Sequence, residues 1–456
     1  MGDRHAPSEA PSPSSALPSL AEATRVWFRI GCTSFGGPAG QIALLHREVV
    51  DERRWISDRR FLHALNFCSL LPGPEAQQLA TYLGWLLHGA KGGLIAGLLF
   101  IVPGALVMMV LSVVFVIAGD VPAVDALFFG LKCAVLVIVF EALLRVARRA
   151  LRGPPSWVMA AAAFAALFLF AVPFPAVVLA AALTGALMPA RFSAGAHASA
   201  KAGPPAILDA VMDADPSYAR RLAKSARRAG LIALAAWAAP VAVLLPMAGI
   251  YADVAWFFSK MAVVTFGGAY AVLAYVAQEA VEGYAWLSAT EMLTGLGLAE
   301  TTPGPLILVL QFVGFLAGYG ASTGLSGLAG GVVASLLTLW VTFAPCFAFV
   351  FLGAPAIERL QEKPALAGAL AAITAAVVGV IANLALWFGL RVIFSQVEAF
   401  EWGWLSVGLP VPASLDGLAL AIALLAALAL FRLKLGVLKT LGICSAAGLV
   451  LKLGFA

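Results

Sequence analysis

Stretches of about twenty apolar residues, separated by short charged or turn-forming loops, recur along this chain from residue 24 onward. Hydrophobic residues make up 62% of the 456 residues and charged residues only 12%, unlike a soluble domain of this size. The stretches are rich in Ala, Leu, Val and Gly without alternation of apolar and polar residues, which favours helices over a membrane barrel. We therefore expect an all-α polytopic membrane protein, with the lipid bilayer as its surroundings.

A Pro-Gly-Pro break occurs twice in the chain, and the two copies are 231 positions apart. The same spacing relates two copies of a Phe-Gly-Gly break. Further on, Pro103 and Pro345 are 242 positions apart, so one loop of the second half has grown by 11 residues. The chain is thus predicted to be two homologous repeats. The breaks are Phe35-Gly36-Gly37 and Pro72-Gly73-Pro74 in the first, and Phe266-Gly267-Gly268 and Pro303-Gly304-Pro305 in the second.

Each break is expected to end one helix and begin another. Proline cannot continue a helix through its own position, but it is favoured as the first residue of a new one. Glycine lets the backbone approach a bound ion closely. The free N–H groups at the start of the new helix carry partial positive charge and suit an anion. The plainer interpretation is that Gly and Pro, which are common in membrane helices, only kink them.

The distribution of Lys and Arg predicts the orientation, because short basic loops prefer the cytoplasm. Nine full spans fit this rule, and the four broken segments would raise the count to roughly thirteen if each crossed the membrane. We expect them to be re-entrant pairs of half-helices, since otherwise the Arg-rich loop 47–60 would lie outside. Either count places the N-terminus in the cytoplasm and the C-terminus in the periplasm, and inverts one repeat relative to the other. Inverted repeats with broken helices are typical of secondary transporters, whose substrate binds near the midplane.

The chain is expected to divide into five parts. These are a disordered cytoplasmic tail (1–23), repeat 1 (24–190), a basic cytoplasmic linker (191–229), a linker transmembrane helix (230–250) and repeat 2 (251–456). The tail lacks the apolar core of a cleavable signal. The net charge of +5 lies mostly in short loops, so it reports orientation and predicts no nucleic-acid partner. The oligomeric state stays open, a homo-oligomer included.

Arg29 and Lys260 are the strongest candidate anion-binding cations, because each lies six residues before its Phe-Gly-Gly motif. A cation at the centre of a membrane helix costs on the order of 3 kcal/mol and is usually functional, although either side chain could instead extend to the interface and anchor its segment. Lys132, in a later apolar stretch, is a third candidate, but Thr374 takes its place in repeat 2. The other candidate ligands are the residues of the four breaks, the hydroxyls of Thr33, Ser34 and Thr265, and Gln77.

Glu75 directly follows Pro74, where a carboxylate suits the start of a helix, so simple capping is one interpretation. The other is proton coupling, because a carboxylate withdrawn from water can take up a proton, and its negative charge would repel a bound anion. Glu300 is its loose counterpart in the second half and not its aligned partner.

These motifs resemble the chromate transporter family. The resemblance rests on Thr33–Pro38, the loop ending Arg53-Arg54-Trp55 and Leu71–Tyr82 in the first half, and on Thr265–Gly268 and Ala299–Pro305 in the second. It covers nearly the whole chain after residue 23, in the long-chain, two-repeat form. It implies export of chromate from the cytoplasm across the inner membrane, driven by the membrane potential or the proton gradient, and resistance to chromate.

Chromate is a tetrahedral dianion, so moving it out of a negative interior gains about 4.6 kcal/mol per 100 mV. No nucleotide motor is needed, and the sequence has no phosphate-binding loop motif. The nearest alternative is transport of another oxyanion such as sulfate, which has the same charge and shape. A membrane redox enzyme would need redox cysteines, haem ligands or a flavin site, and the five cysteines are scattered without metal-ligand spacing. We therefore expect no cofactor, no metal site and no enzymatic reaction.

Overall fold

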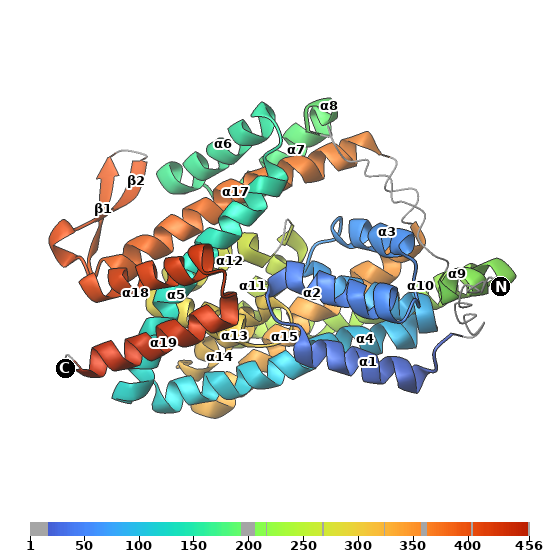
Figure 1. Ribbon diagram of the computed structural model, residues 1–456, viewed down its shortest axis with the longest axis horizontal. Coiled ribbons are helices and arrows are strands. Elements are labelled where there is room, and N and C mark those ends of the chain that lie inside the picture. Colours follow the sequence, from blue (N-terminus) through green and yellow to red (C-terminus); the bar gives the residue numbers. More distant parts are fainter. Residues whose placement is uncertain are drawn as a thin grey trace, which may run out of the picture.

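The computed structural model describes residues 17–192, 206–215, 217–266, 269–322, 324–356, 363–402 and 405–454, and these are almost entirely helical (Figure 1). Most of the expected N-terminal tail lies outside the described residues, as do Gly267 and Gly268. Among the described residues, six helices are long and apolar enough to span a bilayer, and shorter apolar helices accompany them. Many Leu and Val side chains on these helices point outward, as lipid-facing residues do. The chain is an all-α, multi-pass membrane protein, as the sequence predicts.

The elements follow one another in two similar series joined by a linker. Repeat 1 contains α1 (Leu20–Thr33), α2 (Gly37–His46), the π-helical η1 (Arg47–Glu52), α3 (Asp58–Cys68), α4 (Glu75–Ala118), α5 (Pro122–Ala150), α6 (Pro154–Phe170) and α7 (Phe174–Leu187). The linker contains α8 (Pro189–Phe192), α9 (Ile207–Ala214), α10 (Tyr218–Leu244) and η2 (Leu245–Met247). Repeat 2 contains α11 (Ile250–Val264), α12 (Ala269–Gln278), η3 (Glu279–Gly283), α13 (Ala289–Thr301), η4 (Leu306–Leu308), α14 (Val309–Tyr319), α15 (Gly327–Gly353), η5 (Ala354–Ala356), α17 (Pro364–Ile393), β1 (Val397–Trp402), β2 (Leu405–Pro410), η6 (Pro412–Ser414), α18 (Gly417–Ala427), η7 (Leu428–Arg432) and α19 (Val437–Gly454).

Helix α4 is a hairpin of two arms and not one straight rod. Its backbone leaves the helical conformation at His88 and Gly89, where φ of Gly89 is +62°. The arms then run side by side, since a Cβ atom on Gly84 would lie 2.5 Å from the carbonyl oxygen of Gly92. In repeat 2, α14 and α15 pack in the same way, with Gly318 against the carbonyl of Gly330. Small residues let the arms of each hairpin approach this closely.

The spacing of 231 positions is visible in the backbone. The π-helices η1 and η3 occupy equivalent places, and each is followed by a residue with positive φ, Arg54 at 54° and Ala285 at 52°. The amide of Trp55 then donates to the carbonyl of Val49 at 2.9 Å, and the amide of Trp286 to that of Ala280 at 2.8 Å. The two halves therefore fold in the same local conformation.

The spacing of 242 positions relates α5 to α17, because both helices begin at a proline 242 positions apart. Gly448 of α19 packs on the backbone of Ala126 in α5, and Gly185 of α7 packs on that of Gly368 in α17. Ala126 and Gly368 are also 242 positions apart. Since neither helix contains an insertion, the match continues to their far ends, where Arg149 is equivalent to Arg391.

Two element boundaries and a hairpin differ from the expected division. Helix α1 begins at Leu20, within the range expected for the tail, because the Ser19 hydroxyl accepts the amide of Glu22 and caps the helix. Helix α10 begins at Tyr218 and not near residue 230, since its basic first turns are rich in strong helix formers. The segment 397–410 forms an antiparallel pair of strands, β1 and β2, within a chain that was expected to be all helical.

The linker helix α9 docks on the Arg-rich loop of repeat 1. The amides of Ile207 and Leu208 donate to the carbonyls of Arg54 and Trp55, each at 3.1 Å. Asp209 forms an ion pair with Arg60. Partial burial alone would raise the pKa of Asp209, but hydrogen bonds from Arg60 and Ser57 outweigh it and hold that pKa below its usual 3.8. The linker is thereby tied to the repeat that precedes it.

Candidate functional site

The breaks of the two repeats contact one another reciprocally. The amide of Gly73 donates to the carbonyl of Thr265 at 2.9 Å, and the amide of Gly304 donates to the carbonyl of Ser34 at 3.0 Å. Gly73 and Gly304 are equivalent residues, as are Ser34 and Thr265. Each Pro-Gly-Pro segment therefore pairs with the residue before the Phe-Gly-Gly motif of the other repeat. This exchange is what a two-fold relation between the repeats requires, and it brings their broken helices together.

Buried polar groups reinforce one half of this contact. The amide of Gly304, which donates to the carbonyl of Ser34, also donates to the hydroxyl of Ser34 at 2.9 Å. The side-chain amide of Gln41 donates to the carbonyl of Gly304 at 2.5 Å and to that of Ser34 at 3.3 Å. Sequence reasoning missed Gln41, which has no special spacing, and valine takes its place in repeat 2.

The glycines of the breaks have the conformations that glycine favours. Gly73 and Gly304 have φ of +121° and +92°, and Gly36 and Gly37 have φ of +88° and +68°. Such values cost other residues energy because their Cβ atoms clash with the backbone.

The prolines and phenylalanines of the breaks also contact neighbouring groups. The carbonyl of Pro72 accepts a hydrogen bond from the side chain of Gln78, and the carbonyl of Pro303 packs against Gly104. Phe35 and Phe266 each donate an amide to the carbonyl two residues earlier, at 3.0 Å.

The three expected hydroxyl donors already use their hydrogens within their own helices. Thr33 donates to the carbonyl of Arg29 at 2.8 Å, Ser34 donates to that of Gly31 at 3.0 Å, and Thr265 donates to that of Met261. Ser and Thr hydroxyls often donate in this way to a carbonyl about one turn earlier in the chain. In this arrangement they close the helices.

A cavity of about 390 Å³ lies beside the crossing and is lined by the starts of three helices. Pro38 stands at the start of α2, Glu75 at the start of α4, and Ala269 and Tyr270 at the start of α12. Helix starts present partial positive charge and unused N–H groups. Two of the helices belong to repeat 1 and the third to repeat 2, so the repeats build the cavity together. The other polar lining residues are Asn66, Ser69, Arg145, Arg149 and Thr374.

The charged side chains of this cavity come mainly from α5. Arg145 is paired with Glu141 one turn earlier, with Nε to Oε1 at 3.2 Å. Arg149, one turn further on, is exposed and makes no ion pair with any described residue. The carboxylate of Glu75 lies within hydrogen-bonding reach of the Ser69 hydroxyl and is attracted electrostatically by the guanidinium of Arg149. The cavity thus offers one unpaired cation and one carboxylate to an entering anion.

A second carboxylate, that of Glu300, is bonded to the cavity-lining residue Tyr270. The hydroxyl of Tyr270 donates to Oε1 of Glu300 at 2.5 Å, and both side chains are buried. Glu300 is equivalent to Ser69, which lies beside Glu75 in the lining of the first cavity. Each repeat therefore contributes a carboxylate to this region from a different position, which is why alignment alone left Glu300 only a loose counterpart of Glu75.

The three expected cations do not line this cavity. Arg29 is exposed on α1, while Lys260 lies 5.4 Å from the ring centre of Tyr275. Lys132 lies 4.9 Å from the ring centre of Phe129, beside a different cavity. Gln77 is fully buried and donates to the Thr81 hydroxyl at 3.0 Å. The cations that line the cavity, Arg145 and Arg149, were not among the candidate ligands predicted from the sequence.

Comparison with known proteins identifies the family. The family model described as "Chromate transporter" matches residues 21–186 and 252–450, one match for each repeat. The chain belongs to the chromate transporter family. It is therefore a membrane transporter and not an enzyme, and the resemblance seen in the sequence is confirmed.

Curated relatives of this chromate transporter family member agree with that assignment. A "Chromate transport protein" of Pseudomonas aeruginosa is 33% identical over 405 residues, which cover 87% of this chain and 86% of the relative. A "Chromate transport protein" of Cupriavidus metallidurans is 26% identical, with 80% and 81% covered. A "Probable chromate transport protein" of Synechococcus elongatus is 24% identical, with 81% and 85% covered. No solved structure matches the chain.

Proposed function

We propose that this protein exports chromate from the cytoplasm across the inner membrane, and that the cavity beside the crossing binds the ion. The observation that carries the proposal is the meeting of three helix starts and two arginines, Arg145 and Arg149, around one cavity built by both repeats. Helix starts and guanidinium groups are the donors that suit a tetrahedral oxyanion. The names of the curated relatives support chromate as the ion.

The direction and the driving force follow from charge. Arg148 and Arg149 lie in the last turn of α5, and the basic linker and α10 follow in the chain, so this end is the cytoplasmic one under the positive-inside rule. The cavity then takes its ion from the cytoplasm. A dianion leaving a negative interior gains about 4.6 kcal/mol per 100 mV, which is enough to drive export.

Proton coupling is assigned to Glu75. Its carboxylate lines the same cavity as Arg149, so an ionised Glu75 competes with the dianion for that cation and also repels the dianion. Protonation of Glu75 removes both effects. Proton binding and chromate binding at this cavity therefore favour each other, and a proton that leaves with the dianion lowers the electrical gain to about 2.3 kcal/mol per 100 mV.

The remaining candidates have roles outside the cavity. Arg29, Lys260 and Lys132 are proposed to attract the ion toward the breaks or to anchor their helices. Neutralising Arg29 or Lys260 separates these roles, because attraction would show as slower transport at low chromate concentration and anchoring as lower membrane abundance.

The test is chromate uptake by inverted membrane vesicles at matched protein abundance, with an imposed potential and with sulfate as competitor. We expect uptake that increases with the potential and that excess sulfate inhibits only weakly. Vesicles that accumulate sulfate but not chromate would contradict the substrate. Uptake that does not respond to the potential would contradict the driving force.

A further inference from the structure

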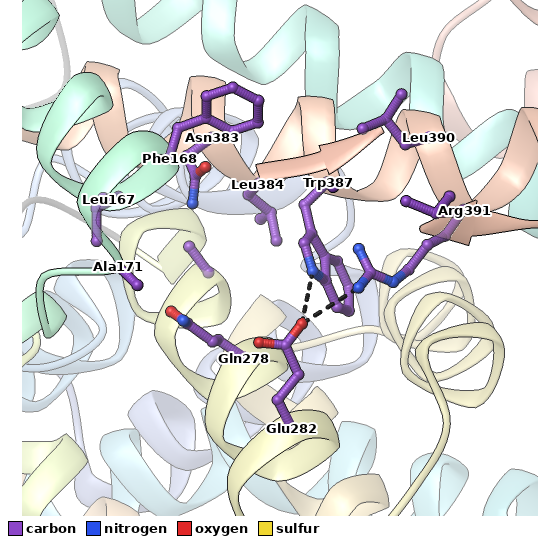
Figure 2. Close-up of a pocket in the computed structure, with 13 residues that line it drawn as sticks. Leu167, Phe168, Ala171, Gln278, Glu282, Asn383, Leu384, Trp387, Leu390 and Arg391 are labelled. Atoms are coloured by element: carbon purple, nitrogen blue, oxygen red, sulfur yellow. Dashed lines mark hydrogen bonds and ion pairs between the residues drawn. The ribbon is translucent and has the colours of Figure 1, made fainter. Parts of the chain in front are cut away.

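A second cavity of about 320 Å³ lies between α12 with η3 and the later part of α17 (Figure 2). Its polar lining includes Gln278, Glu282, Asn383, Trp387 and Arg391. Figure 2 shows Trp387 and Arg391 directed at one carboxylate, that of Glu282. The indole Nε1 donates to Oε1 of Glu282 at 3.0 Å, and Nη2 of Arg391 lies 3.2 Å from the same oxygen. The guanidinium also lies 4.1 Å from the ring centre of Trp387, which holds it in place.

The two cavities lie one after the other along two helices, α12 and α17, which line both of them. Tyr270 of α12 lines the first cavity, and Ala274 and Gln278 of the same helix line the second. On α17, Ile381 lines the first cavity and Leu384 the second. Asn383, two residues after Ile381, also lines the second cavity, so the two linings on α17 are about 3 Å apart along the helix. Two cavities so close together along shared helices are what alternating access requires of two half-paths.

The charged residues at the second cavity have equivalents in repeat 1, at or near the first cavity. Arg391 is equivalent to Arg149, and Glu282 is equivalent to Asp51. At the second cavity the pair is formed, with Arg391 on Glu282. At the first cavity it is not, because Asp51 is paired with His46 at 3.2 Å and Arg149 makes no ion pair among the described residues. The arginine of the second cavity is therefore occupied by the protein's own carboxylate, whereas the equivalent arginine of the first cavity is left for an anion.

We propose that the second cavity is a second binding site for the transported tetrahedral oxyanion, with Arg391 and Trp387 as its donors and the Glu282 carboxylate occupying the anion's place until that end opens. This rests on the proposed function. One carboxylate oxygen takes both hydrogen bonds, as one oxygen of a dianion would. Glu282 lies in η3, directly after α12, and α12 begins at the first cavity, so a shift of this half-helix would reach both sites.

The test counts chromate ions bound per chain by equilibrium dialysis of the purified full-length protein. We expect one ion for the wild type, two for Glu282→Gln, and one for Glu282→Gln combined with Arg391→Gln. In Glu282→Gln combined with Arg391→Lys, the added site should persist at about tenfold weaker affinity, since a lysine cannot form the planar fork of arginine. The matched control is Glu279→Gln, on the same turn as Glu282, which should leave the count at one.

The first cavity serves as an internal reference in every variant. A retained first ion shows that the variant is folded, so a Glu282→Gln protein that still binds only one ion overturns the second site and leaves the proposed function standing. A second ion that survives Arg391→Gln also overturns it. A wild type that binds no chromate, with vesicles that take none up, contradicts the proposed function instead.

Discussion

The crossing of the repeats depends on glycine at Gly73, and replacing this residue with alanine tests that dependence. The φ of +121° is unfavourable for alanine by about 1–2 kcal/mol. The new Cβ would also lie 2.8 Å from both the Cys346 sulfur and the Gln78 side-chain nitrogen, and such overpacking costs about 1–3 kcal/mol. We therefore expect Gly73→Ala to lower the free energy of unfolding by about 2–5 kcal/mol.

The assay is thermal unfolding of the detergent-purified protein, together with chromate uptake at matched abundance. The control is Gly442→Ala in α19, where the added Cβ meets nothing within 4 Å. Removing a helical glycine there should be neutral or raise stability by up to about 1 kcal/mol. If Gly73→Ala unfolds at the wild-type temperature and transports normally, the crossing does not depend on this conformation and the reasoning fails.

Two further predictions concern hydrogen bonds. Tyr270→Phe leaves the buried Glu300 carboxyl without its hydrogen bond and should cost about 1–3 kcal/mol in thermal unfolding, and an unchanged melting temperature would contradict the pairing. The depressed pKa of Asp209 means that its ion pair with Arg60 contributes full stability above pH 3.8 and loses it as pH falls through the lowered value. Asp209→Asn should therefore speed limited proteolysis of the linker at pH 7. It should also remove the dependence of the proteolysis rate on pH in the acid range. If the linker is cleaved at the same rate in the wild type and the variant, the docking of α9 is contradicted.

The sequence predicts the repeats and their breaks because helix breaking is local. Two prolines flanking a glycine end a helix, so Pro72-Gly73-Pro74 and its copy locate the breaks without knowledge of packing, whereas the single prolines Pro103 and Pro345 lie inside α4 and α15. The spacings of 231 and 242 positions correctly predict which residues are equivalent, down to the paired π-helices η1 and η3. That broken helices from both repeats meet follows from the same reasoning, and the reciprocal bonds of Gly73 and Gly304 confirm it.

The members of the cavity could not be predicted, because packing decides which face of a helix points inward. Gly31 packs against the carbonyl of Leu99, and Arg29, two residues earlier, lies about 200° away around α1 and is exposed. The spacing of a residue from a motif does not show which face of the helix packs inward. Arg149 was missed for a different reason. It is one of four arginines between residues 145 and 152, and clustered arginines at the end of an apolar stretch indicate membrane orientation and not a binding site.

The central claim is that the anion binds where Arg149 and the helix starts of both repeats meet, and a pair of neighbouring variants tests it directly. Arg149 lines the cavity, whereas Arg148, also exposed and in the same helical turn, does not. In inverted vesicles at matched abundance and fixed potential, Arg149→Gln should lower chromate uptake at subsaturating concentration at least about tenfold, and Arg148→Gln should leave it near the wild-type rate. Equal uptake by the two variants would contradict the account.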